Sequence, residues 1–108
     1  MAKEKKWLTK ICTVLANPKY RNTAQVFVDK NRKGIPVMAC ALGELLLQST
    51  IKEYEDERTS DAIRRSLEKF YKVPKELRQA VFTNINSWNG ARITKKRIAV
   101  LMRKKYCT

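Results

Sequence analysis

Hydrophobic residues recur at helical spacing in five parts of the chain, which predicts five helices. The first set precedes Pro18, which disfavours helical backbone in the residue before it and so ends the helix. This set consists of Trp7, Leu8, Ile11, Cys12 and Leu15. The second predicted helix runs from Met38 to about Tyr54 and is apolar on most sides, so we expect it in the middle of the fold.

Three further helices are predicted in the second half of the chain. Ser60 is a candidate N-cap for the first of them, and Pro74 is well placed as the first residue of the next. Gly90 stands where a left-handed C-terminal cap would follow, and the closing helix begins after Thr94. The inward-facing residues of these helices are Ile63, Leu67, Phe70 and Tyr71, then Leu77, Val81, Ile85 and Trp88, and last Ile98, Leu101 and Met102.

Residues 23–38 differ, because apolar and polar side chains alternate there. Ala24, Val26 and Val28 share one face, which is typical of a strand, and Gly34 supplies the backbone freedom that a return needs. We therefore predict a short hairpin whose second strand lies at an edge, since Pro36 has no N–H to donate. The predicted fold class is mainly α: a single compact domain, residues 1–108, of about five helices with one short β-hairpin.

Charge is the strongest feature of the composition, with 24 lysines and arginines against 10 acidic residues and a formal net charge of +14. Residues 1–33 hold 9 basic and 2 acidic side chains, residues 34–73 hold 6 and 7, and residues 74–108 hold 9 and 1. Solubility alone would be served by mixed signs, so this segregation favours an anionic partner. The expected partner is nucleic acid, either DNA or RNA, or an acidic protein surface.

The closing helix places this charge in an unusual position. Three cations follow Thr94 in the first turn, where free N–H groups and the helix dipole are already positive. A bound phosphate would make the arrangement favourable; alternatively, the long side chains extend into water while their stems cover the core. Together with the hairpin turn and the rest of the helix, the candidate nucleic-acid- or anion-binding residues are Lys30, Arg32, Lys33, Thr94, Lys95, Lys96, Arg97, Arg103, Lys104 and Lys105.

Catalysis is not expected from the sequence. The chain has no histidine, which is the usual general base and the commonest transition-metal ligand. Cys40 stands at the start of a predicted helix, where the dipole can lower a thiol pKa, but no base is visible for it. The default for Cys12 and Cys40 is that of small buried hydrophobes. The three cysteines form no C-x-x-C pair, and we predict no enzyme, no catalytic residue, no metal and no cofactor.

CALGELL at residues 40–46, SWNG at residues 87–90 and the following ITKKRIAVLMRKK helix resemble a family of small bacterial and phage proteins of unknown function. In that family a Trp-Cys-Ala-Leu-Gly-Ala-Leu stretch precedes a Trp-Asn-Asp turn and a short Thr-initiated helix. Here Ala39 replaces the tryptophan and Gly90 the aspartate. The resemblance implies no activity, and it fits a phage or mobile-element origin. It also implies one structural corner formed by Cys40, Gly43, Trp88 and Asn89.

The N-terminal residues lack the apolar run of a signal peptide, and the longest apolar stretch, Val37–Leu47, is too short to span a bilayer. We expect a cytoplasmic protein without a membrane partner, in the host cytoplasm if a phage encodes it.

Three hypotheses about function follow. The first is a small, non-catalytic basic protein that contacts nucleic-acid phosphates through its basic terminal helices and hairpin turn. The alternative is a phage-encoded inhibitor of the anti-defence type, which binds a host protein. The third is capture of a small anionic nucleotide at the Thr94 helix start. Residues 92–105 also resemble the Thr-initiated second helix of helix-turn-helix domains, which is kept as a variant of the first hypothesis.

Overall fold

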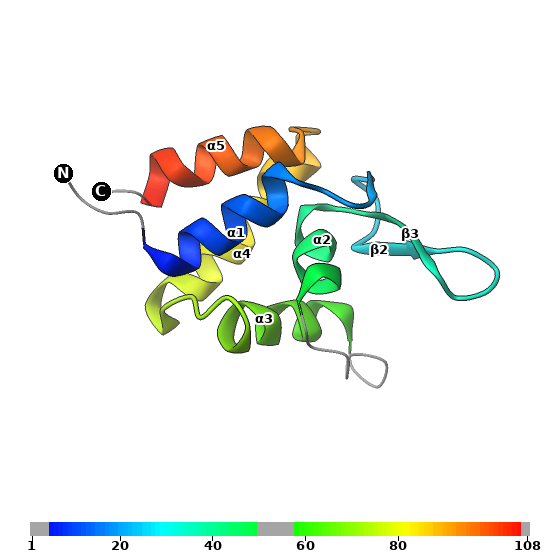
Figure 1. The fold of residues 1–108 in the computed structure, drawn as a ribbon, viewed down its shortest axis with the longest axis horizontal. Coiled ribbons are helices and arrows are strands. Elements are labelled where there is room, and N and C mark those ends of the chain that lie inside the picture. The colour runs from blue at the N-terminus through cyan, green and yellow to red at the C-terminus, as the bar shows by residue number, and fades with distance from the viewer. Residues whose placement is uncertain (1–4, 50–57, 107–108) are drawn as a thin grey trace.

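The structure, a computed structural model, describes residues 5–49 and 58–106, which form five helices and three short strands (Figure 1). The elements in chain order are α1 (Lys6–Ala16), β1 (Arg21–Asn22), β2 (Val28–Lys30), β3 (Pro36–Ala39), α2 (Ala41–Gln48), α3 (Thr59–Lys69), α4 (Lys75–Gly90) and α5 (Lys95–Tyr106). The prediction of a mainly α fold with about five helices and a short hairpin is confirmed.

The first and last helices lie side by side and run in opposite directions (Figure 1). At one end the rings of Trp7 and Tyr106 meet edge to face, with centroids 5.6 Å apart. Farther along, the Cys12 thiol donates to the carbonyl of Ala99 at 3.4 Å. Because the apolar stripes of both helices face this seam, most of their basic side chains lie on the outside.

Helix α2 occupies the middle of the fold, as predicted, and its residues 41–46 are all buried. The sequence predicts that this helix begins at Met38. It begins at Ala41 instead, because residues 36–39 belong to β3. Two side chains cap its start: Cys40 Sγ accepts from the Gly43 N–H at 3.4 Å, and Asn89 Oδ1 accepts from the Ala41 N–H at 3.0 Å. The C-terminal part of the predicted helix, residues 50–54, lies outside the described residues.

The starts of α3 and α4 are close to their predicted places. Ser60 is not the N-cap of α3, because the helix already begins at Thr59 and its N-cap is Arg58. Pro74 is the N-cap of α4 rather than its first helical residue. Both differences are of one or two residues, which is the usual uncertainty of a helix end.

The end of α4 differs more from its prediction. Gly90 is the last helical residue, and the left-handed conformation falls on Arg92, with φ 63°. The N–H of Arg92 donates to the carbonyl of Asn89 at 3.0 Å, and that of Ile93 to the carbonyl of Trp88 at 3.1 Å. This is the Schellman pattern of hydrogen bonds, and it fixes the turn from α4 into α5.

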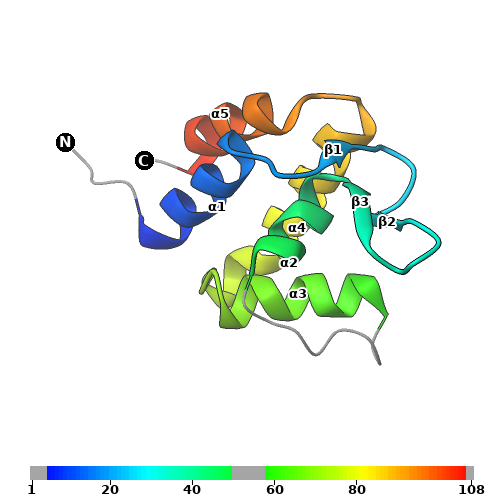
Figure 2. The same cartoon turned by 45° about the vertical axis from the view of Figure 1, so that its right-hand side comes forward.

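Strand β3 is the central strand of a small mixed sheet, with β1 parallel on one side and β2 antiparallel on the other (Figure 2). The prediction that the Pro36 strand lies at an edge is therefore wrong. Pro36 is tolerated because it is the first residue of β3, whereas β1 pairs with Met38 and Ala39 farther along.

The first strand of the predicted hairpin is displaced along the chain, to residues 28–30 instead of the alternating segment 24–28. That segment is irregular because it is held against the helices. The Phe27 carbonyl accepts the Cys40 N–H at 3.0 Å, and the Phe27 ring packs edge to face on Phe82, with centroids 6.3 Å apart. Contacts with the helices override the alternating pattern here.

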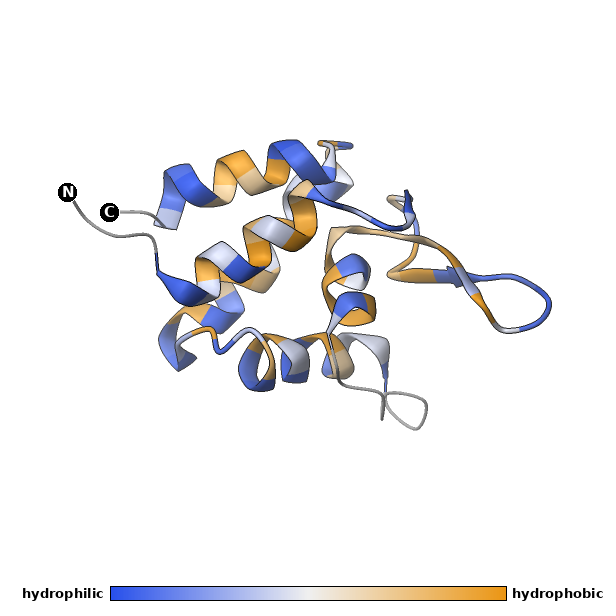
Figure 3. Cartoon of the chain, in the orientation of Figure 1, coloured by the Kyte–Doolittle hydropathy of each residue, from blue (hydrophilic) through white to orange (hydrophobic). Residues whose placement is uncertain are grey.

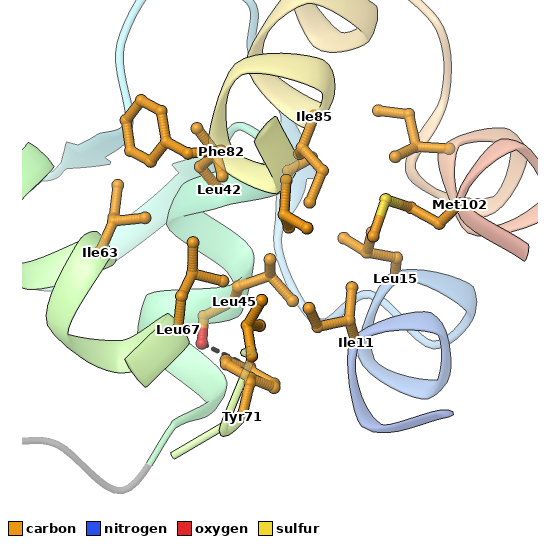
Figure 4. Packing of buried hydrophobic residues seen from close by; sticks show 14 of the residues in the cluster. Ile11, Leu15, Leu42, Leu45, Ile63, Leu67, Tyr71, Phe82, Ile85 and Met102 are labelled. Atoms are coloured by element: carbon orange, nitrogen blue, oxygen red, sulfur yellow. Dashed lines mark hydrogen bonds between the residues drawn. The ribbon is translucent and has the colours of Figure 1, made fainter. Parts of the chain in front are cut away.

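Side chains from all five helices meet in one hydrophobic core (Figure 4). Leu42 and Leu45 of α2 lie between Ile63 and Leu67 on one side and the α1 residues on the other. Tyr71 is fully buried, and its hydroxyl donates to the carbonyl of Leu45 at 2.6 Å. The polar end of this large side chain is thereby satisfied inside the core.

Candidate nucleic-acid interface

Strands β2 and β3 and the turn between them, residues 28–39, form an arm that projects from one end of the molecule (Figure 1). Asn31 shapes its tip, because Oδ1 accepts the N–H groups of Lys33 and Ile35 at 2.9 and 3.0 Å. Gly34 adopts φ +76° in the same turn. Arg32 and Lys33 are exposed at the tip, a hydrophilic stretch in Figure 3, and Lys30 is exposed at the end of β2.

The solvent side of α5 carries cations and no carboxylate. Its buried side is formed by Ile98, Ala99 and Met102, together with Lys95. Val100 is 38 % exposed and lies on the outer side. The exposed cations of the helix are Lys96, Arg97, Arg103, Lys104 and Lys105.

Thr94 caps the start of α5. Its Oγ1 accepts the Arg97 N–H at 3.2 Å, and its carbonyl accepts the Ile98 N–H at 2.9 Å. The cap uses one of the N–H groups that a phosphate at this helix start would bind. The Thr94 side chain therefore serves to cap α5 rather than to bind an anion.

Lys95 was expected on the surface of the closing helix, but it is buried. Its side chain is only 3 % exposed, and Nζ donates to Glu44 Oε1 at 2.7 Å and to the Tyr20 carbonyl at 2.9 Å. The anion that makes a cation acceptable in this first turn is thus a carboxylate of the protein itself. Lys95 is removed from the candidate surface.

Glu44 is completely buried in α2 and has four donors around it. Besides Lys95, it accepts the backbone N–H groups of Lys19 and Tyr20, at 3.1 and 3.2 Å, and Gln48 Nε2 at 2.7 Å. Such a complete set of partners is what a buried charge requires. The network ties the segment after α1 to both α2 and α5.

A second polar junction lies at the start of α2. Asn89 is 3 % exposed; besides capping Ala41, its Nδ2 donates to the Thr23 carbonyl at 3.1 Å. Gly43 is needed beside it, because a Cβ at that position would lie 1.8 Å from the Phe27 carbonyl oxygen. Cys40, Gly43 and Asn89 therefore do meet in one corner, whereas Trp88 contributes its carbonyl to the turn before α5.

The remaining predicted site residues lie in two groups. The arm and the C-terminal end of α5 point toward opposite ends of the molecule, whose longest dimension is 49 Å (Figure 1). Two exposed arginines that the sequence analysis did not select stand between these groups in the fold: Arg92 in the turn before α5, and Arg21 in β1, which pairs with β3 of the arm (Figure 2). Arg92 stands four residues before Lys96 in the sequence, whereas the pairing of β1 with β3 relates Arg21 to the cations of the arm.

Two aromatic side chains near the basic residues, Phe27 and Tyr106, pack on other rings in the described part of the chain. Tyr106 packs on Trp7, and its hydroxyl accepts from Asn84 Nδ2 at 2.7 Å. Phe27 is turned toward Phe82. These aromatic rings serve the core, whereas a single-strand binder offers its rings to bases.

Cys40, at the start of α2, is a cysteine whose reactivity depends on its surroundings. Burial raises the pKa of the Cys40 thiol, and the N–H bonds of Gly43 and Leu42 and the charge of Lys95 lower it by less. The helix start therefore does not make Cys40 a reactive thiolate at neutral pH. Residues 5–49 and 58–106 contain no cluster of three or more cysteine, aspartate or glutamate residues suited to a metal ion. Cys107 lies outside that part of the chain.

None of the helices in the described part of the chain has the length and apolar character needed to cross a membrane. Comparison of the chain with protein-family models, with curated proteins and with solved structures finds no match.

Proposed function

We propose that this chain is a small, non-catalytic nucleic-acid-binding protein that contacts phosphates through the outer side of α5 and the tip of the arm, without strong sequence readout. One observation carries the proposal: α5 exposes five cations and contains no acidic residue. Adjacent like charges repel one another along a helix, and an anionic backbone laid beside them removes that repulsion.

The dimensions of α5 suit such a backbone. A helix rises 1.5 Å per residue, so these 12 residues span about 18 Å, or about five base-pair steps of a duplex. Lys96 and Arg97 lie at one end of that length and Arg103 and Lys104 at the other. Contacts of this kind bind phosphates and carry no base information, which is the reason for expecting weak sequence preference.

The test is fluorescence anisotropy with a labelled 20-mer duplex, single-stranded DNA and RNA over a salt series. Five or six phosphate contacts predict that log affinity falls against log salt with a slope of about −5 on duplex DNA. The triple variant Lys96→Gln/Arg97→Gln/Lys104→Gln should weaken binding to every sequence and flatten that slope by about 2.7. Failure of the folded wild type to bind at low salt would refute the proposal, and an unchanged slope in the triple variant would remove α5 from the interface.

A charge-conserving variant provides the matched control. Lys96→Arg/Arg97→Lys/Lys104→Arg alters the same three positions and keeps all three charges, so its salt slope should equal that of the wild type. Loss of binding in this control would mean that the geometry of individual side chains matters more than phosphate charge.

One observation favours the second candidate, an inhibitor that binds a host protein. Val26, Ile35 and Val37 are 49, 55 and 41 % exposed, and the last two lie on the arm or at its tip. Exposed apolar side chains on a projecting arm suit a protein surface better than a phosphate backbone. A pull-down from nuclease-treated lysate distinguishes the two, because a protein retained after nucleic acid is destroyed supports inhibition and an empty bait opposes it.

Capture of a small nucleotide at the start of α5 loses support, because Lys95 is buried and Thr94 already caps the helix.

A further inference from the structure

The molecule has a second basic surface that the function proposed above does not use. An open groove of about 480 Å³ lies between α3 and the start of α4. Two carboxylates, Asp61 and Glu68, line it together with five cations. The cations are Arg64, Arg65, Lys69, Lys75 and Arg78.

Two of the guanidinium groups are held in place by the protein. Arg78 Nε donates to the Val73 carbonyl at 2.9 Å. Arg64 lies over the ring of Phe82, with Cζ 4.2 Å from the centroid, and Nη1 donates to Gln79 Oε1. A guanidinium has five N–H groups, so Arg64 and Arg78 each keep N–H groups that can donate to a phosphate. Because both side chains are already held in place, binding would cost less side-chain entropy.

The acidic residues of the groove do not neutralise it. Glu68 is shared between Lys69 and Arg78, at 3.4 and 3.7 Å, and its side chain is 42 % exposed. Exposed pairs of this kind contribute little and exchange readily with another anion. Asp61 is the other carboxylate among the described residues that line the groove, where cations outnumber carboxylates by five to two.

The groove and the outer side of α5 belong to opposite sides of the molecule. Helix α5 lies at the top and α3 at the bottom in both views (Figures 1 and 2). Helices α1 and α2 lie between them: α1 packs on α5 and on α2, and α2 packs on α3. A single nucleic-acid segment on α5 therefore leaves the groove free.

We propose that the α3–α4 groove is a second phosphate-binding surface, so that one molecule holds two nucleic-acid segments at once and bridges them. The inference rests on the proposed function, because it requires α5 to bind a first segment. A protein with one basic side coats a duplex, whereas a protein with two opposed basic sides links duplexes. Once the first segment is bound, the second surface is held at high local concentration near any neighbouring segment.

The experiment uses one duplex fixed on beads and a second, labelled duplex in solution, with the whole protein added at increasing concentration. The amount of labelled duplex retained on the beads should rise with protein concentration, pass through a maximum and then fall, because excess protein occupies each duplex separately. The variant Arg64→Gln/Lys69→Gln/Lys75→Gln should retain at least five-fold less label, while its anisotropy affinity for a single duplex changes less than three-fold. If the triple variant does not fold, the exposed pair Lys69→Gln/Lys75→Gln serves, with Lys69→Arg/Lys75→Arg as the charge-conserving control.

Each outcome separates the two proposals. Anisotropy binding without retention of the labelled duplex overturns bridging and leaves the proposed function intact. Absence of anisotropy binding overturns the proposed function itself. Retention that is equal in the wild type and the groove variants assigns bridging to another surface, such as one between copies of the chain, and overturns the role of the groove.

Discussion

Removal of the ammonium group of Lys95 should destabilise the fold far more than removal of any exposed lysine. The substitution Lys95→Met keeps most of the buried stem. It leaves Glu44, which is 0 % exposed, without its countercharge, and the Tyr20 carbonyl without the donor at 2.9 Å. Three neutral donors remain on the carboxylate, from the backbone of Lys19 and Tyr20 and from Gln48.

The expected magnitude follows from this geometry. Breaking a buried pair by removal of one partner costs about 3–5 kcal/mol, because the other charge stays buried. For a domain of this size that corresponds to a fall in Tm of about 12–20 °C. Glu44→Gln should cost a similar amount. The double variant Glu44→Gln/Lys95→Met should be about 2–3 kcal/mol more stable than the sum of the single effects predicts, since neither charge is then left alone.

Urea denaturation of the four proteins in this cycle measures the coupling. Lys96→Met is the matched control: the same change at the next, exposed position should alter the free energy of unfolding by less than about 0.5 kcal/mol. A cost of less than about 1 kcal/mol for Lys95→Met, or single effects that add up to that of the double variant, would show that Lys95 and Glu44 are not coupled as a buried pair.

Three further changes test other parts of the fold. Gly43→Ala should lower the free energy of unfolding by about 3 kcal/mol in urea melts, because the new Cβ would lie 1.8 Å from the Phe27 carbonyl oxygen; wild-type stability would contradict the close approach. Arg92→Gly should raise it by about 0.5–1 kcal/mol, since glycine adopts φ 63° without strain, and a loss would contradict the assignment of the left-handed residue. Burial raises the pKa of both the Cys40 thiol and the Tyr71 hydroxyl, so the unfolded chain loses these protons first and stability should fall above about pH 8.5, by at most about 1.4 kcal/mol per pH unit per group. Urea midpoints from pH 7 to 10.5 measure that slope, and Cys40→Ala should reduce its first part; an identical slope in that variant would exclude the thiol.

The helices could be predicted from the sequence because their signals are local. Burial of one face imposes a period of about 3.6 residues on the apolar positions, and this period is visible without knowledge of the partner helix. The stripe from Trp7 to Leu15 shows this, since all five of its residues are buried. The hairpin was predicted less well, because Phe27 is drawn toward Phe82 and Cys40 by contacts that no local alternation records.

The candidate surface could be predicted only in part, for the same reason. Glu44 and Lys95 are 51 residues apart in sequence, and they meet because α2 and α5 both pack on α1. A sequence signal was nevertheless present. Lys95 continues the inward stripe of Ile98, Ala99 and Met102, and Glu44 interrupts the most apolar helix of the chain. A charge on an apolar face at each of two helices is a reason to look for a buried pair.

The position of Lys95 also changes how the net charge bears on function. A cation held by Glu44 releases no counterion from a phosphate, so α5 supplies at most five phosphate contacts and about −4.5 of the salt slope. Burial of Lys95 also removes one of the three like charges from the solvent side of the first turn. What remains on that side is a set of cations with no carboxylate among them, and the arm must supply any steeper dependence. A slope well beyond −5 in the wild type, lost on Arg32→Gln/Lys33→Gln, would therefore place the arm and α5 on the same nucleic acid.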